Sequence, residues 1–131
     1  MESQADIVLI RQSVFDLQVA PGAYDLVYDS GCFHHMPRHR RNLYAKLVTH
    51  ALRPGGWFGL TCFRPEGGSG YTDADVYARR SLGGGLGYTE ERLREVWSAH
   101  LTVRSLRQMK EQQPHSGLFG LPFLWALFAQ K

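Results

Sequence analysis

The sequence predicts an α/β fold, because strand-like and helix-like segments alternate along it with short joints. Residues 24–28 form a nearly continuous apolar run, which is typical of a parallel strand covered on both faces. Residues 57–63 form a second such run, and residues 38–52 between them carry apolar side chains at helical spacing. A strand, a helix and a strand joined in this way pair the two strands in parallel, so these three segments indicate the fold class.

An earlier apolar run precedes these segments. Ile7 to Ile10 is short and rich in β-branched side chains, so it predicts another buried strand, with residues 13–16 as its exit. Residues 20–23, Ala-Pro-Gly-Ala, then predict a turn before the strand at residues 24–28.

The helix between the two parallel strands has a predicted start, stop and buried face. Pro37 suits a first helical turn, where its missing N–H has no intrahelical partner. Residues 53–56, Arg-Pro-Gly-Gly, should end the helix, since Pro cannot continue it and Gly supplies a left-handed cap. Arg41, Lys46 and Thr49 are expected to face solvent. The expected buried positions are Leu43, Tyr44, Leu47, Val48, Ala51 and Leu52.

The second half of the chain predicts a loop, a helix and two strands. Residues 67–87 hold seven of the 14 glycines and are interpreted as a flexible lid with a short helix at residues 72–80. Thr89 caps a further helix. Residues 101–109 and 122–128 predict strands joined by a long hairpin connection. The aromatic side chains expected in the core here are Phe119, Phe123, Trp125 and Phe128.

Composition limits the protein class. A chain of 131 residues, 44% hydrophobic and 21% charged, suits one globular domain. The net charge is +3, but basic residues cluster only at Arg38, Arg40 and Arg41, which argues against a nucleic-acid surface. Cys32 and Cys62 lie far apart, which indicates free thiols in a reducing compartment.

The apolar segments are too short for membrane insertion. The first ten residues lack the basic and long apolar regions of a secretory signal. Residues 118–129 are shorter than the roughly 20 residues that a membrane span requires. We therefore expect a soluble, cytoplasmic protein that has no membrane partner.

A cluster of potential ligands follows the strand at residues 24–28. Asp29, Cys32, His34, His35 and His39 include the thiolate and imidazole groups that zinc prefers, but no second ligand pair at zinc-like spacing accompanies them. A metal site is therefore not expected. Two interpretations stay open: one histidine packs under the helix while the other is simply exposed, or the histidines face a ligand at the carboxyl end of a parallel strand.

Taken in order, these motifs resemble the carboxyl-terminal part of a class I S-adenosylmethionine-dependent methyltransferase. The resemblance rests on residues 13–17, 24–31, 34–37 and 51–60, with an amphipathic helix before the last of these. The nearest subgroup is the thiopurine or tellurite-resistance type, which acts on small molecules. The resemblance implies a Rossmann-like sheet and makes residues 1–131 a partial methyltransferase domain. This domain is expected to lack the first strands of the family's sheet and its glycine-rich loop.

The resemblance also assigns cofactor-binding positions for S-adenosylmethionine. Ser13 and Val14 stand where the family's loop touches the adenine ring. Asp29, Ser30 and Gly31 stand at the strand end beside the methionine portion of the cofactor.

The implied reaction requires little acid–base chemistry, because methyl transfer from a sulfonium mainly needs an aligned acceptor in a dry pocket. The resemblance places His34 toward the reacting centre. If the small-molecule acceptor must lose a proton, His34 or His35 is the natural base. Asp29 could instead bind or orient the acceptor. Aromatic side chains of the glycine-rich segment expected to cover the acceptor are Tyr71, Tyr77 and Tyr88.

The absence of the family's front half leaves three hypotheses. The sequence could begin late within a longer enzyme, or the chain could complete its sheet with a second copy or a separate amino-terminal chain. The third hypothesis is a non-catalytic binding or interaction module derived from the methyltransferase fold. Because the family's glycine-rich loop at the cofactor is missing, the isolated chain is expected to be inactive without the missing half. The unpaired sheet edge that remains is a template for pairing with another chain.

Overall fold

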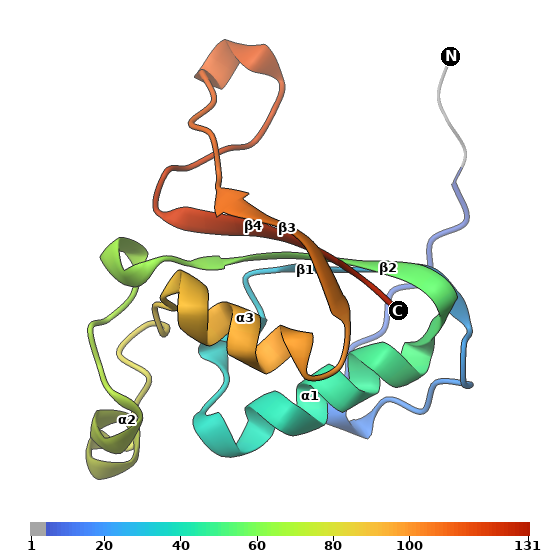
Figure 1. Ribbon diagram of the computed structural model, residues 1–131, viewed down its shortest axis with the longest axis horizontal. Helices are drawn as coiled ribbons and strands as arrows, with labels where there is room; N and C mark the ends of the chain where they lie inside the picture. The colour runs from blue at the N-terminus through green and yellow to red at the C-terminus, as the bar shows by residue number, and fades with distance from the viewer. Residues whose placement is uncertain (1–4) are drawn as a thin grey trace.

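The computed structural model describes residues 5–131 and contains one four-stranded sheet in the order β1-β2-β4-β3. Strands β1 and β2 are parallel, whereas β4 runs antiparallel to both β2 and β3. This arrangement confirms the predicted α/β fold and the parallel pair (Figure 1). The elements are β1 (Tyr24–Ser30), α1 (Arg38–Ala51), β2 (Leu52–Phe63), α2 (Asp73–Arg79), α3 (Glu90–Ser98), β3 (Thr102–Gln108) and β4 (Leu124–Gln130).

The hydrophobic core lies between one face of the sheet and the helices α1 and α3, which Figure 1 shows on the same side of the sheet. Trp97 of α3 is fully buried, and its ring centroid lies 4.3 Å from that of Phe58 on β2. Tyr44 of α1 meets the same indole edge to face at 6.0 Å. These aromatic contacts fix both helices against the sheet.

Helix α1 is confirmed, but its ends differ from the prediction. Pro37 is the N-cap residue with an extended backbone, one position before the first helical turn. The helix ends at Ala51, because Leu52 is already extended and begins β2. Strand β2 therefore starts five residues before the predicted strand at residues 57–63.

The buried face of α1 also differs from the prediction. Leu47, predicted to be buried, and Thr49, predicted to face solvent, are both half-buried. Arg41, predicted to face solvent, is only 6% exposed because Asp73 of α2 pairs with its guanidinium. Leu43, predicted to be buried, is 46% exposed. Lys46 is exposed as expected, and the buried apolar residues of the helix are Tyr44, Ala45, Val48 and Ala51.

The predicted strand at Ile7 to Ile10 is wrong. These four side chains are between 61% and 91% exposed, and the segment has no regular secondary structure. Strand β1 forms one edge of the sheet, and within residues 5–131 no strand pairs with its outer side. Residues 7–10 therefore join no sheet, although the outer edge of β1 is free. Ser13 then caps the 3₁₀ turn η1 (Val14–Asp16).

Strand β1 is not covered on both faces, contrary to the prediction. Leu26 and Tyr28 of β1 are 58% and 59% exposed, and Trp57 of β2 and Phe128 of β4 are also exposed. The pairing register places these four side chains on one face of the sheet, and their exposure shows that α1 and α3 cover the other face. We call them the open sheet face. Phe128 and the more exposed Phe119 thus lie outside the core predicted for the aromatic tail.

The remaining elements of the second half are confirmed. Helix α2 begins after Thr72, whose hydroxyl accepts a hydrogen bond from the N–H of Asp75 in a capping box. Thr89 caps α3 through a single hydrogen bond, which its hydroxyl accepts from the N–H of Arg92. Strands β3 and β4 form the predicted antiparallel pair. In residues 5–131, no helix is both long and apolar enough to cross a membrane.

Candidate functional site

The carboxyl ends of the parallel strands β1 and β2 meet at one edge of the sheet. There the chain leaves β1 through Gly31 and forms the 3₁₀ turn η2 (Phe33–His35), while β2 ends at Phe63. We call residues 29–35 together with Phe63 and Gly85 the strand-end site. Ligands of open α/β sheets bind at this end of the strands, so this position is a candidate site.

Asp29 organises the turn at this site. Its carboxylate accepts hydrogen bonds from the N–H of Cys32 at 2.7 Å, the N–H of Phe33 at 3.1 Å and the hydroxyl of Tyr44 at 2.5 Å. Burial raises the pKa of Asp29, and these three hydrogen bonds oppose that rise. Burial and the neighbouring Asp29 also raise the pKa of Tyr44, so Tyr44 stays a donor. Asp29 therefore shapes the loop with both of its oxygens.

Gly31 turns the backbone away from the strand with a φ of +85°, a backbone conformation that residues other than glycine rarely adopt. Its N–H donates to the carbonyl oxygen of Thr61 on β2 at 3.1 Å. A Cβ at Gly31 would lie 3.5 Å from both Cε1 and Nε2 of His34. The neighbouring Ser30 is exposed, and its Oγ lies 3.4 Å from the hydroxyl of Thr61.

His34 is buried and tightly held. Its ring stacks on that of Phe63 with a centroid distance of 3.8 Å and an angle of 2°. Its Nδ1 accepts a hydrogen bond from the N–H of Phe63 at 3.0 Å, and its carbonyl oxygen accepts one from the N–H of Leu86 at 2.7 Å. Burial, together with the charge of His35, lowers the pKa of His34 to about 4. The ring is therefore neutral at physiological pH.

His35 has a different environment, although it is adjacent in sequence. Its side chain is exposed, and its ring meets that of His34 edge to face at 4.5 Å. The structure thus brings together five residues expected from the sequence: Asp29, Ser30, Gly31, His34 and His35.

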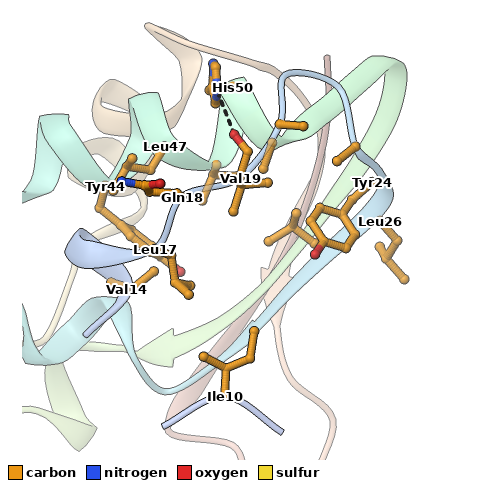
Figure 2. A pocket seen from close by; sticks show the side chains of 15 residues that line it. Ile10, Val14, Leu17, Gln18, Val19, Tyr24, Leu26, Tyr44, Leu47 and His50 are labelled. Carbon is orange, nitrogen blue, oxygen red and sulfur yellow. Dashed lines mark hydrogen bonds between the residues drawn. The ribbon is translucent and has the colours of Figure 1, made fainter. Parts of the chain in front are cut away.

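Ser13 and Val14 lie beside a separate apolar groove. The groove has a volume of about 980 Å³ and lies between residues 10–27 and α1 (Figure 2). Val14 and Tyr44 line it, whereas the Ser13 hydroxyl accepts a hydrogen bond from the N–H of Phe15 at 3.3 Å. Tyr44 connects the groove to the strand-end site through its bond to Asp29.

The three tyrosines of the glycine-rich segment do not share one role. Tyr88 is 1% exposed and packs on Phe33 at 5.0 Å, so it belongs to the core and does not cover an acceptor. Tyr77 is half exposed, and its hydroxyl lies 2.8 Å from Nδ1 of His39. The guanidinium of Arg79 lies over the Tyr71 ring, with its Cζ 4.8 Å from the ring centroid.

An ion-pair network attaches α2 to the rest of the domain. Asp73 accepts two hydrogen bonds from Arg41 of α1, at 2.6 and 3.1 Å, and also pairs with Arg92 of α3. Burial would raise the pKa of Asp73, but the two guanidinium groups outweigh it and hold that pKa below its ordinary value. No sequence pattern indicates this network, because its three members come from three different helices.

Sequence reasoning also missed Tyr44, Phe63 and Gly85 at the site. Phe63 was expected only as the end of a strand, yet it supports the His34 ring. Gly85 has a φ of +149°, and a Cβ there would lie 2.6 Å from the Phe63 ring. The sequence signals were indirect: Phe63 ends a predicted strand, Gly85 belongs to the glycine-rich segment, and Tyr44 was expected only as a buried residue of the helix.

Metal ligation finds no support in the part of the chain that the structure describes. No group of three or more His, Cys, Asp or Glu side chains in residues 5–131 could hold a metal ion. Both cysteines are free, and burial raises the pKa of the Cys62 thiol.

Comparison with protein-family models and with curated proteins finds no match. Solved structures do match. A SAM-dependent methyltransferase from Methanosarcina mazei aligns with a TM-score of 0.67 and 17% identity, over 92% of this chain and 65% of that protein. An S-adenosylmethionine-dependent methyltransferase from Mesorhizobium loti aligns with a TM-score of 0.67 and 14% identity, over 93% and 68%.

A third structure is the 1,6-didemethyltoxoflavin-N1-methyltransferase from Burkholderia thailandensis, with bound 1,6-didemethyltoxoflavin and S-adenosylhomocysteine. It aligns with a TM-score of 0.66 and 22% identity, over 93% of this chain and 49% of that protein. The chain therefore spans about half to two thirds of these proteins. It has the Rossmann-like fold of class I methyltransferases, as the sequence predicted.

Proposed function

We propose that this chain is the carboxyl-terminal part of an S-adenosylmethionine-dependent methyltransferase that acts on a small molecule. The observation that carries the proposal is the strand-end site: a tight glycine turn and two histidines lie at the carboxyl ends of the parallel strands. The likeness in fold to methyltransferases supports it. The thiopurine or tellurite-resistance subgroup remains the subgroup proposed from the sequence.

The described residues fit one wall of an S-adenosylmethionine site. Gly31 turns the half-buried backbone at the strand end, Ser30 is exposed beside it, and Asp29 holds the turn in shape. Val14 lies in an apolar groove that suits a flat ring, with Ser13 at its side. Bound there, the cofactor would supply a methyl group on a positively charged sulfur.

The chain's own residues would align the acceptor and exclude water. The acceptor would lie against His34 and His35, because these side chains stand beside Gly31 at the end of β1. The N–H of Leu86 donates a hydrogen bond to the carbonyl oxygen of His34, so the glycine-rich segment is held against the turn. Such positioning supplies most of what an in-line methyl transfer requires.

The exposed surfaces support a requirement for a further polypeptide. The outer edge of β1, the apolar groove and the open sheet face all adjoin one another on β1. We propose that a second copy, or a separate amino-terminal chain, pairs with β1 and covers these surfaces. Backbone groups at a sheet edge and apolar side chains beside it are both stabilised by an added strand.

The same surfaces favour a second candidate function, a non-catalytic interaction module. In that case the groove and the open sheet face would bind a protein partner, and the strand-end site would bind no cofactor. Cofactor affinity therefore separates the two candidates.

The test is calorimetric titration of the chain with S-adenosylhomocysteine, with light scattering to measure its oligomeric state. We expect micromolar binding that Gly31→Ala weakens at least several-fold. Gly117→Ala is the matched control, since Gly117 also has a left-handed φ of +73° but a Cβ there would meet nothing within 4 Å. Absence of heat from a folded sample would favour the interaction module, as would equal effects of the two variants.

The partner proposal has its own variant pair. Leu26→Lys places a charge on the open sheet face and should reduce self-association seen by light scattering. Leu43→Lys, on the exposed side of α1, should leave it unchanged. A monomer that is unaffected by either variant would contradict pairing with a second copy and leave a separate chain as the partner to seek.

A further inference from the structure

The two histidines at the strand-end site differ in what their ring nitrogens can do. Nδ1 of His34 accepts a hydrogen bond from the N–H of Phe63, and a nitrogen that accepts carries no proton. The neutral ring must therefore carry its proton on Nε2. No residue of the described chain accepts a hydrogen bond from this Nε2–H. The Nε2 atom is not fully buried, so a bound molecule can reach it. His34 thus offers a donor, not a lone pair, beside Gly31.

This donor is fixed in direction. The ring is stacked on Phe63 at 3.8 Å, and its main chain is held by the N–H of Leu86. Gly85 approaches the same ring closely, since a Cβ there would lie 3.4 Å from Cδ2 of His34. A donor held by packing on one side and hydrogen bonds on the other needs no reorganisation when it binds a partner.

His35 has the complementary chemistry. Its side chain is exposed, and its ring forms no hydrogen bond within residues 5–131. A neutral imidazole of this kind keeps one nitrogen lone pair that can accept a proton. The rings of His34 and His35 lie 4.5 Å apart, so one small molecule can contact both.

We infer that His34 is a positioning residue that donates its Nε2–H to the methyl acceptor, while His35 receives the proton that the acceptor loses. This inference rests on the proposed function and specifies its substrate class. The acceptor would carry a lone-pair atom, such as a carbonyl oxygen, next to the N–H or O–H group that becomes methylated.

The acceptor's proton moves to the free nitrogen of His35, which becomes an imidazolium. With the cofactor bound, the lone pair left on the acceptor atom would form the bond to the cofactor's methyl carbon, and the electron pair of the broken carbon–sulfur bond would stay on the cofactor's sulfur. The neighbouring lone-pair atom is held throughout by the Nε2–H of His34.

The first experiment determines the tautomer in the isolated chain by long-range proton–nitrogen correlation NMR of ¹⁵N-labelled imidazole rings. We expect His34 to show the neutral Nε2–H form at pH 7. His34→Gln, which retains an amide donor, and His34→Leu, which has none, identify the signals by their loss, and His115→Gln is the exposed control. An Nδ1–H tautomer or a charged ring for His34 would overturn the inference.

The second experiment uses two probes in the same spectra. The compound 2-pyridone has a carbonyl next to an N–H, whereas 1-methyl-2-pyridone keeps the carbonyl and lacks the N–H. Both should shift the Nε2–H signal of His34, but only 2-pyridone should move the His35 signals. His34→Gln should keep the His35 response and His34→Leu should lose it. Unchanged His34 signals with both probes, or identical responses of His35 to the two, would contradict the assigned roles.

Neither experiment requires cofactor binding or turnover. A failed S-adenosylhomocysteine titration would therefore reject the proposed function without affecting the tautomer and probe results. Conversely, a wrong tautomer beside micromolar cofactor binding would reject the roles of the two histidines alone.

Discussion

The hydroxyl of Tyr44 lies 2.5 Å from Oδ2 of Asp29, and this hydrogen bond joins helix α1 to the end of strand β1. Both side chains are buried, and Asp29 also accepts the N–H groups of Cys32 and Phe33. The strand-end site therefore depends on a helix residue that faces the core. Removing this donor would leave a buried carboxylate with fewer partners.

Tyr44→Phe should accordingly destabilise the domain by about 1–3 kcal/mol, the usual cost of depriving a buried acceptor of its donor. The free energy of unfolding in urea is the measurement. Tyr24→Phe is the matched control, because Tyr24 is 50% exposed and this variant should lose little stability. Equal losses for the two variants would show that the hydroxyl of Tyr44 contributes nothing specific.

A second prediction concerns the attachment of α2. Asp73→Ala would leave the guanidinium of Arg41 buried without its carboxylate, which typically costs about 3–5 kcal/mol. Glu66→Ala is the control, because its pair with Arg64 spans 3.5 Å and Glu66 is largely exposed. Hydrogen exchange should then accelerate in α2 for Asp73→Ala only. Unchanged exchange in α2 would contradict the attachment role.

A third prediction tests the contact between the glycine-rich segment and the His34 ring. Gly84 and Gly85 both have positive φ values, +102° and +149°, so alanine strains the backbone at either position. Only at Gly85 would the new Cβ collide with Phe63, at 2.6 Å. We expect Gly85→Ala to cost about 1–3 kcal/mol more than Gly84→Ala and to move the His34 NMR signals. Similar stabilities and unmoved signals would refute a tight contact here.

The fold was largely predictable from the sequence, because local patterns determine most of its elements. Helical periodicity, the capping residues Thr72 and Thr89, and the apolar run at residues 24–28 each indicated a correct element. The strand predicted at Ile7 to Ile10 is wrong, because an apolar run becomes a strand only when it pairs with another strand, and within residues 5–131 it pairs with none. Local pattern carries no information on that partner.

The candidate site was predictable in position but not in detail. Topology places Asp29 through His35 at the carboxyl end of a parallel strand, and the structure confirms that location. Which nitrogen of His34 holds the proton depends on Phe63, nearly 30 residues away along the chain. The burial of Arg41 likewise depends on Asp73 of another helix. Such long-range contacts have no signature in a single sequence.

A last prediction follows from the lowered pKa of His34, about 4 in the folded protein against 6.5 as its ordinary value. Between pH 6.5 and about pH 4, His34 is mostly protonated in the unfolded chain but mostly neutral in the folded protein. The free energy of unfolding is therefore not reduced by His34 above pH 6.5, and it decreases as the pH falls from 6.5 toward 4. At pH 5 the loss should reach about 2 kcal/mol, since each pK unit corresponds to about 1.4 kcal/mol.

The measurement is the free energy of unfolding in urea at pH 7 and pH 5 for the wild type and two variants. His34→Gln cannot titrate at this position, so its stability should fall by about 2 kcal/mol less than that of the wild type over this interval. His115→Gln removes an exposed histidine and should retain the His34-dependent loss. If His34→Gln and the wild type lost equal stability, His34 would be as easily protonated in the folded protein as in the unfolded chain. That result would also contradict a ring locked by Phe63.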